Sequence, residues 1–168
     1  MKRTGIAFAI AAFCVIGSAW TQGPTKEGHR DVLGVIEGDS DLTAFAGVLR
    51  EAGLRDALRG HGPFTLFAPT NEAFARLSQP KREGLLKDKD QLRRVLLYHM
   101  VSGRFSSQDL LAKRTVKTFE GSVLRATMKG KRIGVENGYM TDPELPATNG
   151  IVHLIDIVLI PPAPDNYR

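Results

Sequence analysis

The chain has 168 residues, with 23 lysines and arginines against 18 aspartates and glutamates, and it contains a single cysteine. Its net charge of +5 falls to +3 (21 basic against 18 acidic residues) without Lys2 and Arg3, which is too mild to indicate a nucleic-acid-binding protein. The sequence shows no internal repeat, no low-complexity tract and no second apolar run of membrane-spanning length, so it predicts neither a tandem array nor a membrane domain.

The first residues have the pattern of a secretory signal. Lys2 and Arg3 precede an uncharged apolar run over Ile6 to Ile16, and small residues that end at Ala19 offer a cleavage site. The apolar run is shorter than the roughly 20 residues that span a bilayer. We therefore expect residues 1–19 to be removed. Cys14, the single cysteine, lies within this segment. The chain that remains after cleavage is therefore expected to form no disulfide and no zinc site with a thiolate ligand.

Helical signals dominate the first half of the remaining chain. Residues 20–30 are predicted to be a flexible lead-in. Apolar residues at helical spacing predict a short helix over residues 31–37 and a clearer one through residue 52, capped by Ser40 or Asp41 and ended by Gly53. Further helical segments are expected over residues 54–58, 81–90 and 91–99, and after Ser106 or Ser107.

The segment from Gly62 to Phe74 combines a strand, a corner and the start of a helix. Its residues alternate at the two-residue period of a strand over 64–68, and Pro69 has no N–H to continue a ladder. Thr70 is placed to cap a helix whose first turn contains Glu72, where a carboxylate is favoured.

Strand signals dominate the second half. Short runs over residues 115–119, 122–128 and 132–135 have the spacing of antiparallel hairpins. Pro143 and Pro146 are expected to break the chain before the nearly continuous apolar run of residues 151–160, which predicts a central strand buried on both faces. Helices first and strands later, without regular alternation, predict an α+β domain.

Two stretches resemble the signature motifs of the fasciclin domain family: Gly62 to Phe74, and Ala147 to Pro162. The resemblance covers residues 31–162 and implies a fasciclin-like β-sandwich or wedge, with the two signature strands paired and helices packed around one edge. Residues 163–168 are then a tail. The family also implies an adhesion role and no cofactor.

The resemblance suggests two sites. Tyr98 and His99 match a Tyr-His pair that is linked to adhesion in some members; the other interpretation is structural, because His99 lies on the apolar face of its predicted helix. Glu144 and Leu145 occupy the place of an Asp-Ile adhesion motif of some animal members. A hydrolase that uses His99 with Ser106 or Ser107 is a weaker alternative, since catalytic triads are set by space and not by order.

Two further features come from the residues alone. Asn71 and Asn149 each follow a threonine at a strand edge, which indicates turn chemistry. Between Arg104 and Arg132 eight basic residues face two acidic ones, and the hairpin pattern places Leu124, Ala126 and Met128 on one side and basic residues on the other. The basic face consists of four residues: Arg125, Lys129, Lys131 and Arg132.

Two interpretations of the basic face remain. It is either a solvated edge that resists strand-to-strand aggregation, or a contact for acidic polysaccharide or lipid head groups. The sequence as a whole predicts a secreted or periplasmic, non-enzymatic binding module for a surface, matrix or envelope component. We expect this module to have no cofactor, no metal and no nucleic-acid partner, and to keep no integral membrane segment after signal cleavage. The alternative is a carrier that encloses a small apolar molecule between sheet and helices.

Overall fold

The structure, a computed structural model, describes residues 30–162. The expected signal over residues 1–19, the lead-in as far as residue 29 and the tail over residues 163–168 lie outside the described residues. Within the described part, helices and strands are α1 Val32–Gly38, η1 Ser40–Leu42 (a 3₁₀ turn), α2 Thr43–Glu51, α3 Arg55–Leu58, β1 Phe64–Pro69, α4 Asn71–Ala75, α5 Gln79–Lys87, α6 Lys89–Tyr98, β2 Met100–Ser102, α7 Ser107–Lys113, β3 Thr115–Lys117, β4 Val123–Lys129, β5 Arg132–Val135, β6 Gly138–Ala147 and β7 Gly150–Ile155.

The strands of this part form one seven-stranded mixed sheet in the order β2-β1-β7-β6-β5-β4-β3. Strands β1 and β7 are parallel, and the other neighbours run antiparallel. The sheet curls until its two outer strands meet at a single bridge between Val101 and Thr118. It is therefore a nearly closed barrel with a seam between β2 and β3.

The two signature strands, β1 and β7, are adjacent and both internal in this sheet. Phe64 lies opposite Gly150 and Pro69 lies opposite Ile155, so the two strands are in register along their whole length. All six residues of β7 are buried. The predicted pairing of the signature strands and the internal position of the last strand are both confirmed. The strand ends at Ile155, although the apolar run predicted it as far as residue 160. Thr70 is confirmed as the cap of α4, where its hydroxyl accepts from Ala73 N at 3.3 Å.

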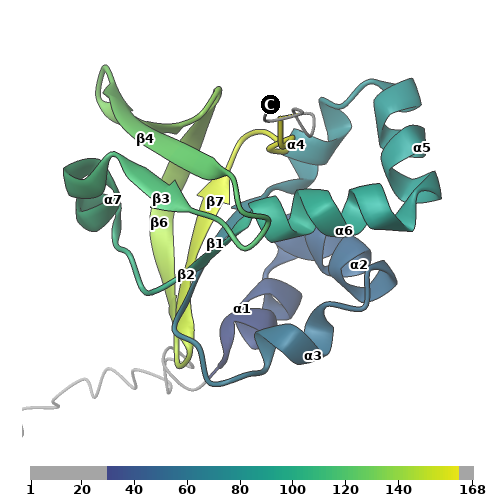
Figure 1. The fold of residues 1–168 in the computed structure, drawn as a ribbon, viewed down its shortest axis with the longest axis horizontal. Helices are drawn as coiled ribbons and strands as arrows, with labels where there is room; N and C mark the ends of the chain where they lie inside the picture. Colours follow the sequence, from purple (N-terminus) through teal and green to yellow (C-terminus); the bar gives the residue numbers. More distant parts are fainter. Residues whose placement is uncertain (1–29, 163–168) are drawn as a thin grey trace, which may run out of the picture.

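Most of the helices lie beside one half of the sheet, and only α7 packs against the other half in the part of the chain that the structure describes. Figure 1 shows α1 to α6 gathered beside the β1 and β7 end, while α7 lies on the other side beside β3. Buried side chains from these helices, from β1 and from β7 form a first core that fills the space between the helices and the sheet. A second core fills the inside of the barrel and includes Phe67, Val101, Val116 and Leu124. The fold is the predicted α+β wedge.

Two local predictions were wrong. Residues 138–147 form a long strand, β6, although Pro143 and Pro146 were expected to break the chain there. The pairing of β6 with β7 shifts register between Thr141 and Leu145, and this bulge accommodates proline within a strand. Neither Ser40 nor Asp41 caps the second helix: Asp39 accepts from Asp41 N at 2.8 Å, and the cap of α2 comes from Asn71.

The predicted hairpins are present, with one change at their tip. Leu124 and Ala126 of β4 are buried in the barrel, as the alternation predicts. Met128, on the same side, is 58% exposed because it lies beyond the end of the core. No helix described over residues 30–162 is both long and apolar enough to cross a membrane.

Candidate functional site

His99 lies at the C-terminal end of α6, where the chain turns from helix into β2. Its ring is fully buried, its Nδ1–H donates to the Val95 carbonyl at 2.8 Å, and its Nε2 accepts from the backbone N–H of Leu159 at 3.0 Å. Burial lowers the pKa of His99 to about 4, although the bond to Val95 opposes this shift. The ring is thus a neutral link between α6 and the segment after β7.

Tyr98 faces the opposite side, into the barrel. Its side chain is 4% exposed, and burial, followed by the charges of Glu136 and Glu120, raises its pKa to about 12. The phenol therefore stays neutral at physiological pH. The structure places both members of the Tyr-His pair in the interior, where they join two cores; a contact of this pair with a partner stays a prediction.

Glu144 and Leu145 lie at the bulge of β6, and each contacts a different part of the fold. A carboxylate oxygen of Glu144 accepts from the backbone N–H of Ser107 at 2.6 Å, at the first turn of α7. Leu145 lies opposite Val152 and packs against the core beneath the helices. Both side chains are only partly exposed. Through these contacts Glu144 links α7 to β6, and Leu145 links the helical layer to β6. Contact of either residue with a partner also stays a prediction.

The structure brings the basic face together on the hairpin β4–β5. Arg125, Lys131 and Arg132 are exposed. Lys129 is half-buried: its Nζ donates to the Glu136 carbonyl at 2.7 Å and lies 5.3 Å from the centre of the Tyr139 ring. The guanidinium of Arg132 lies 4.2 Å from the same ring centre. Tyr139 thus fixes two of the four cations of the basic face.

The position of β4 within the sheet bears on how the basic face is interpreted. Strand β4 pairs with β3 only over residues 123–125 and with β5 over residues 126–129. Arg125 therefore has Thr115 of β3 as its partner, whereas Lys129 pairs only with Arg132 of β5. Strand β5 pairs with β6 only at Gly134 and Val135, so Lys129, Lys131 and Arg132 lie on a hairpin tip without outer strand partners among the described residues. Protection of an edge and contact with an anionic partner both stay predictions for this tip. The hairpin that carries these cations lies away from α1 to α6 (Figure 1).

The hydrogen bonds of His99 bear on the hydrolase alternative. Both of its ring nitrogens are occupied by backbone groups of Val95 and Leu159. The hydroxyl of Ser106 donates to Asp109 at 2.7 Å as part of a capping box that begins α7. The hydrogen bonds of His99 and Ser106 thus give both side chains a structural role. The described residues also contain no group of three or more His, Cys, Asp or Glu side chains arranged to hold a metal ion.

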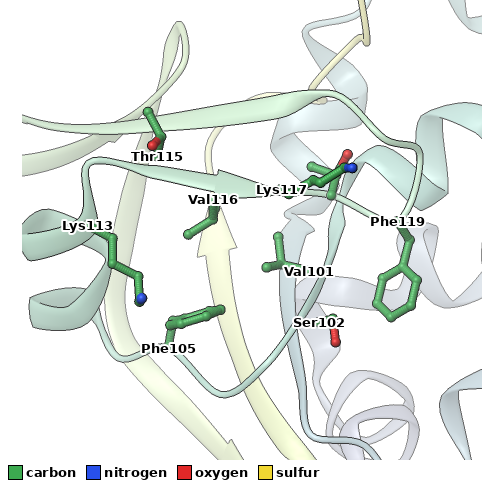
Figure 2. Close-up of a pocket in the computed structure, with 9 residues that line it drawn as sticks. Val101, Ser102, Phe105, Lys113, Thr115, Val116, Lys117 and Phe119 are labelled. Carbon is green, nitrogen blue, oxygen red and sulfur yellow. The ribbon is translucent and has the colours of Figure 1, made fainter.

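A feature that the sequence did not indicate lies at the seam of the barrel. A pocket of about 330 Å³ opens there, which we call the seam pocket (Figure 2). Nine residues line it: Val101, Ser102, Phe105, Lys113, Thr115, Val116, Lys117, Thr118 and Phe119. The pocket depends on β2 and β3 meeting at a single bridge, which no local pattern in the sequence reports. The wedge between helices and sheet, where a carrier site was expected, is filled by core side chains.

Comparisons with known proteins agree with this fold and its motifs. A model of the Fasciclin domain matches residues 40–161. The chain is 35% identical over 130 residues to the uncharacterized protein sll1735 of Synechocystis sp., covering 77% of this chain and 97% of that protein. It is 34% identical over 132 residues to transforming growth factor-beta-induced protein ig-h3 of Sus scrofa, covering 79% of this chain but only 19% of that protein.

A solved structure supports the fold. The FAS1 domain pair from the insect cell adhesion molecule Fasciclin I matches with a TM-score of 0.70 at 22% identity, over 80% of this chain and 52% of that chain. The family model and the sequence relatives together show that the chain belongs to the fasciclin domain family.

Proposed function

We propose that this protein is an exported, non-enzymatic binding module that attaches to a cell-surface, matrix or envelope component. The observation that carries the proposal is its membership of the fasciclin domain family, whose structural match here comes from a cell adhesion molecule. In this proposal residues 1–19 direct export and are removed, residues 20–30 are a lead-in, residues 31–162 are the binding domain and residues 163–168 are a tail.

The basic face is the surface we propose for the contact. Its four cations belong to the hairpin β4–β5, which lies away from α1 to α6. Arg125 pairs with Thr115 of β3, so edge protection does not explain this cation. Tyr139 holds Lys129 and Arg132 in place, which reduces the entropy lost when they bind. Such a surface suits an anionic polysaccharide or anionic lipid head groups.

The experiment compares two variants with the same change in net charge. R125S/K129S/K131S/R132S removes the basic face, and R50S/K81S/K89S/R93S removes four exposed cations from the helical half. Retention on an acidic polysaccharide and on phosphatidylglycerol vesicles is measured at low and at physiological salt. We expect the first variant to lose retention and the second to keep it. Equal loss in both variants, or none in the first, contradicts the proposed surface.

The absence of catalysis has its own test. The purified protein is incubated with activated esters, and turnover is compared with that of His99→Ala. We expect no turnover above background. Ester hydrolysis that disappears in His99→Ala, while the circular dichroism spectrum stays native, overturns the non-enzymatic proposal.

A further inference from the structure

The seam pocket has an apolar floor. Val101, Phe105 and Val116 pack with the core inside the barrel, and in Figure 2 their side chains face a common space between β2, β3 and the loop before α7. Phe119 closes one end, and its ring lies 6.0 Å from that of Phe64. A ligand in this space therefore meets mainly aliphatic and aromatic carbon.

The rim of the seam pocket is cationic. Lys113 and Lys117 both line it, and of the nine lining residues none is acidic. The Lys113 ammonium extends toward Phe105 and lies 5.4 Å from the centre of its ring (Figure 2). Exposed hydroxyls of Ser102 and Thr115 complete the polar edge. An anionic group at Lys113 is thus placed directly beside the apolar floor.

We propose that the seam pocket binds a small amphipathic carboxylate, with the carboxylate on Lys113 and the apolar body against Phe105, Val101 and Val116. The volume of about 330 Å³ lies at the lower end of the roughly 300–1,000 Å³ of small-molecule sites, so one short aliphatic chain or one aromatic ring system fits. This site is separate from the basic face and does not depend on the function proposed above.

The test uses three ligands with one tail and different heads: octanoate, octanol and octylammonium. Binding to the purified protein is followed by the NMR shifts of the Val101 and Val116 methyl groups. We expect octanoate to shift these methyls, and to bind about tenfold more weakly to K113Q/K117Q, because that variant loses the charge-assisted contact with Lys113 and the second cation of the rim. The matched variant K81Q/K89Q, altered at exposed lysines of the helical half, should bind as the parent does.

A second variant separates the pocket from the charge. Ser102→Phe places a ring in the mouth of the pocket at an exposed strand position, where folding tolerates it. We expect it to abolish octanoate binding and to leave retention on acidic polysaccharide unchanged. The proposal is overturned if octanol or octylammonium binds as well as octanoate, if Ser102→Phe keeps its affinity, or if the methyl shifts of Val101 and Val116 do not respond.

Discussion

Asn71 and Asn149 hold helices that are distant in sequence. The side-chain oxygen of Asn149 accepts from Val32 N at 2.8 Å, at the start of α1. That of Asn71 accepts from Ala44 N at 2.9 Å, at the start of α2. A helix leaves its first N–H groups without partners. Asn149 therefore adds to the cap that Asp31 gives α1, and Asn71 supplies α2 with a cap that the helix's own sequence lacks.

The amide nitrogens of the same two residues complete these links. Asn149 Nδ2 donates to the carbonyls of Leu58 and Gly60 at 2.8 and 2.9 Å, and Asn71 Nδ2 donates to Ser40 at 2.8 Å. The sequence predicted a structural role for both asparagines but attributed it to local turns. Their partners lie between 27 and 117 residues away, which local turn chemistry cannot show.

Replacement of Asn149 tests this account. We expect Asn149→Ala to lower the free energy of unfolding by about 3 kcal/mol, because it leaves one N–H and two carbonyls without their partner. Asn149→Asp should not rescue the loss, since a carboxylate can cap α1 but cannot donate to Leu58 and Gly60. Urea unfolding is the measurement, with the exposed Asn137→Ala as control. An Asp variant as stable as the parent contradicts the account.

At the level of elements, β6 shows where local patterns fail. Its two prolines are typical of a chain break, so the sequence predicted an interruption there. The strand forms because β7 supplies a partner on both sides of the bulge, at Met140 and Thr141 and again from Leu145 to Ala147. Pro143 lies within the register shift, and Pro146 lies in the ladder opposite Ile151. By contrast, the strand and cap of Phe64 to Phe74 were predictable, because their signals are local.

Replacement of glycine by alanine is expected to have opposite effects on stability at two positions, Gly150 and Gly84. Gly150 begins β7, and a Cβ there would collide with the Phe64 carbonyl oxygen of the parallel strand β1 and with Val32. Gly84 lies inside α5, where a Cβ meets nothing within 4 Å. We expect Gly150→Ala to destabilise the protein by more than about 2 kcal/mol, and Gly84→Ala to stabilise it by about 1 kcal/mol.

Thermal and urea unfolding of both variants check these signs. The comparison is internal, because the change in side-chain volume is the same at both positions. A loss of stability in Gly84→Ala would show that α5 has packing that its open surroundings do not suggest. If the free energy of unfolding of Gly150→Ala equalled that of the parent, β1 and β7 would be able to separate without cost. The continuous pairing of the two strands predicts the opposite.

At the scale of the whole molecule, two buried histidines join elements across the fold. His99 links α6 to the chain after β7, and His153 of β7 donates to the Phe105 carbonyl at 2.8 Å, which holds the loop before α7 against the barrel. The ring of His153 also stacks on Phe67 at 5.6 Å between ring centres. Helical spacing predicted the burial of His99, but the contacts of both rings depend on the closed sheet.

Burial lowers the pKa of both histidines, that of His99 to about 4. The folded state therefore keeps these rings neutral at pH values where the unfolded chain, with an ordinary pKa near 6.5, takes up protons. The unfolded state binds more protons in this window, so the free energy of unfolding rises with pH between about 4 and 6.5 and is lost as the pH falls through it.

We expect the protein to lose about 2 kcal/mol of stability between pH 7 and pH 5 through His99 alone, with a further loss in the same direction through His153. Hydrogen bonds from Ser106 lower the pKa of Asp109. Burial raises the pKa of Glu120, but the bonds from Ser122 and Arg94 outweigh it and lower the pKa. The stability that these two carboxylates contribute is lost only at lower pH than that of the histidines. Urea unfolding at several pH values measures the slope, which should be smaller in His99→Gln and unchanged in the exposed His61→Gln. A slope that His99→Gln leaves intact would place the titrating group elsewhere in the fold.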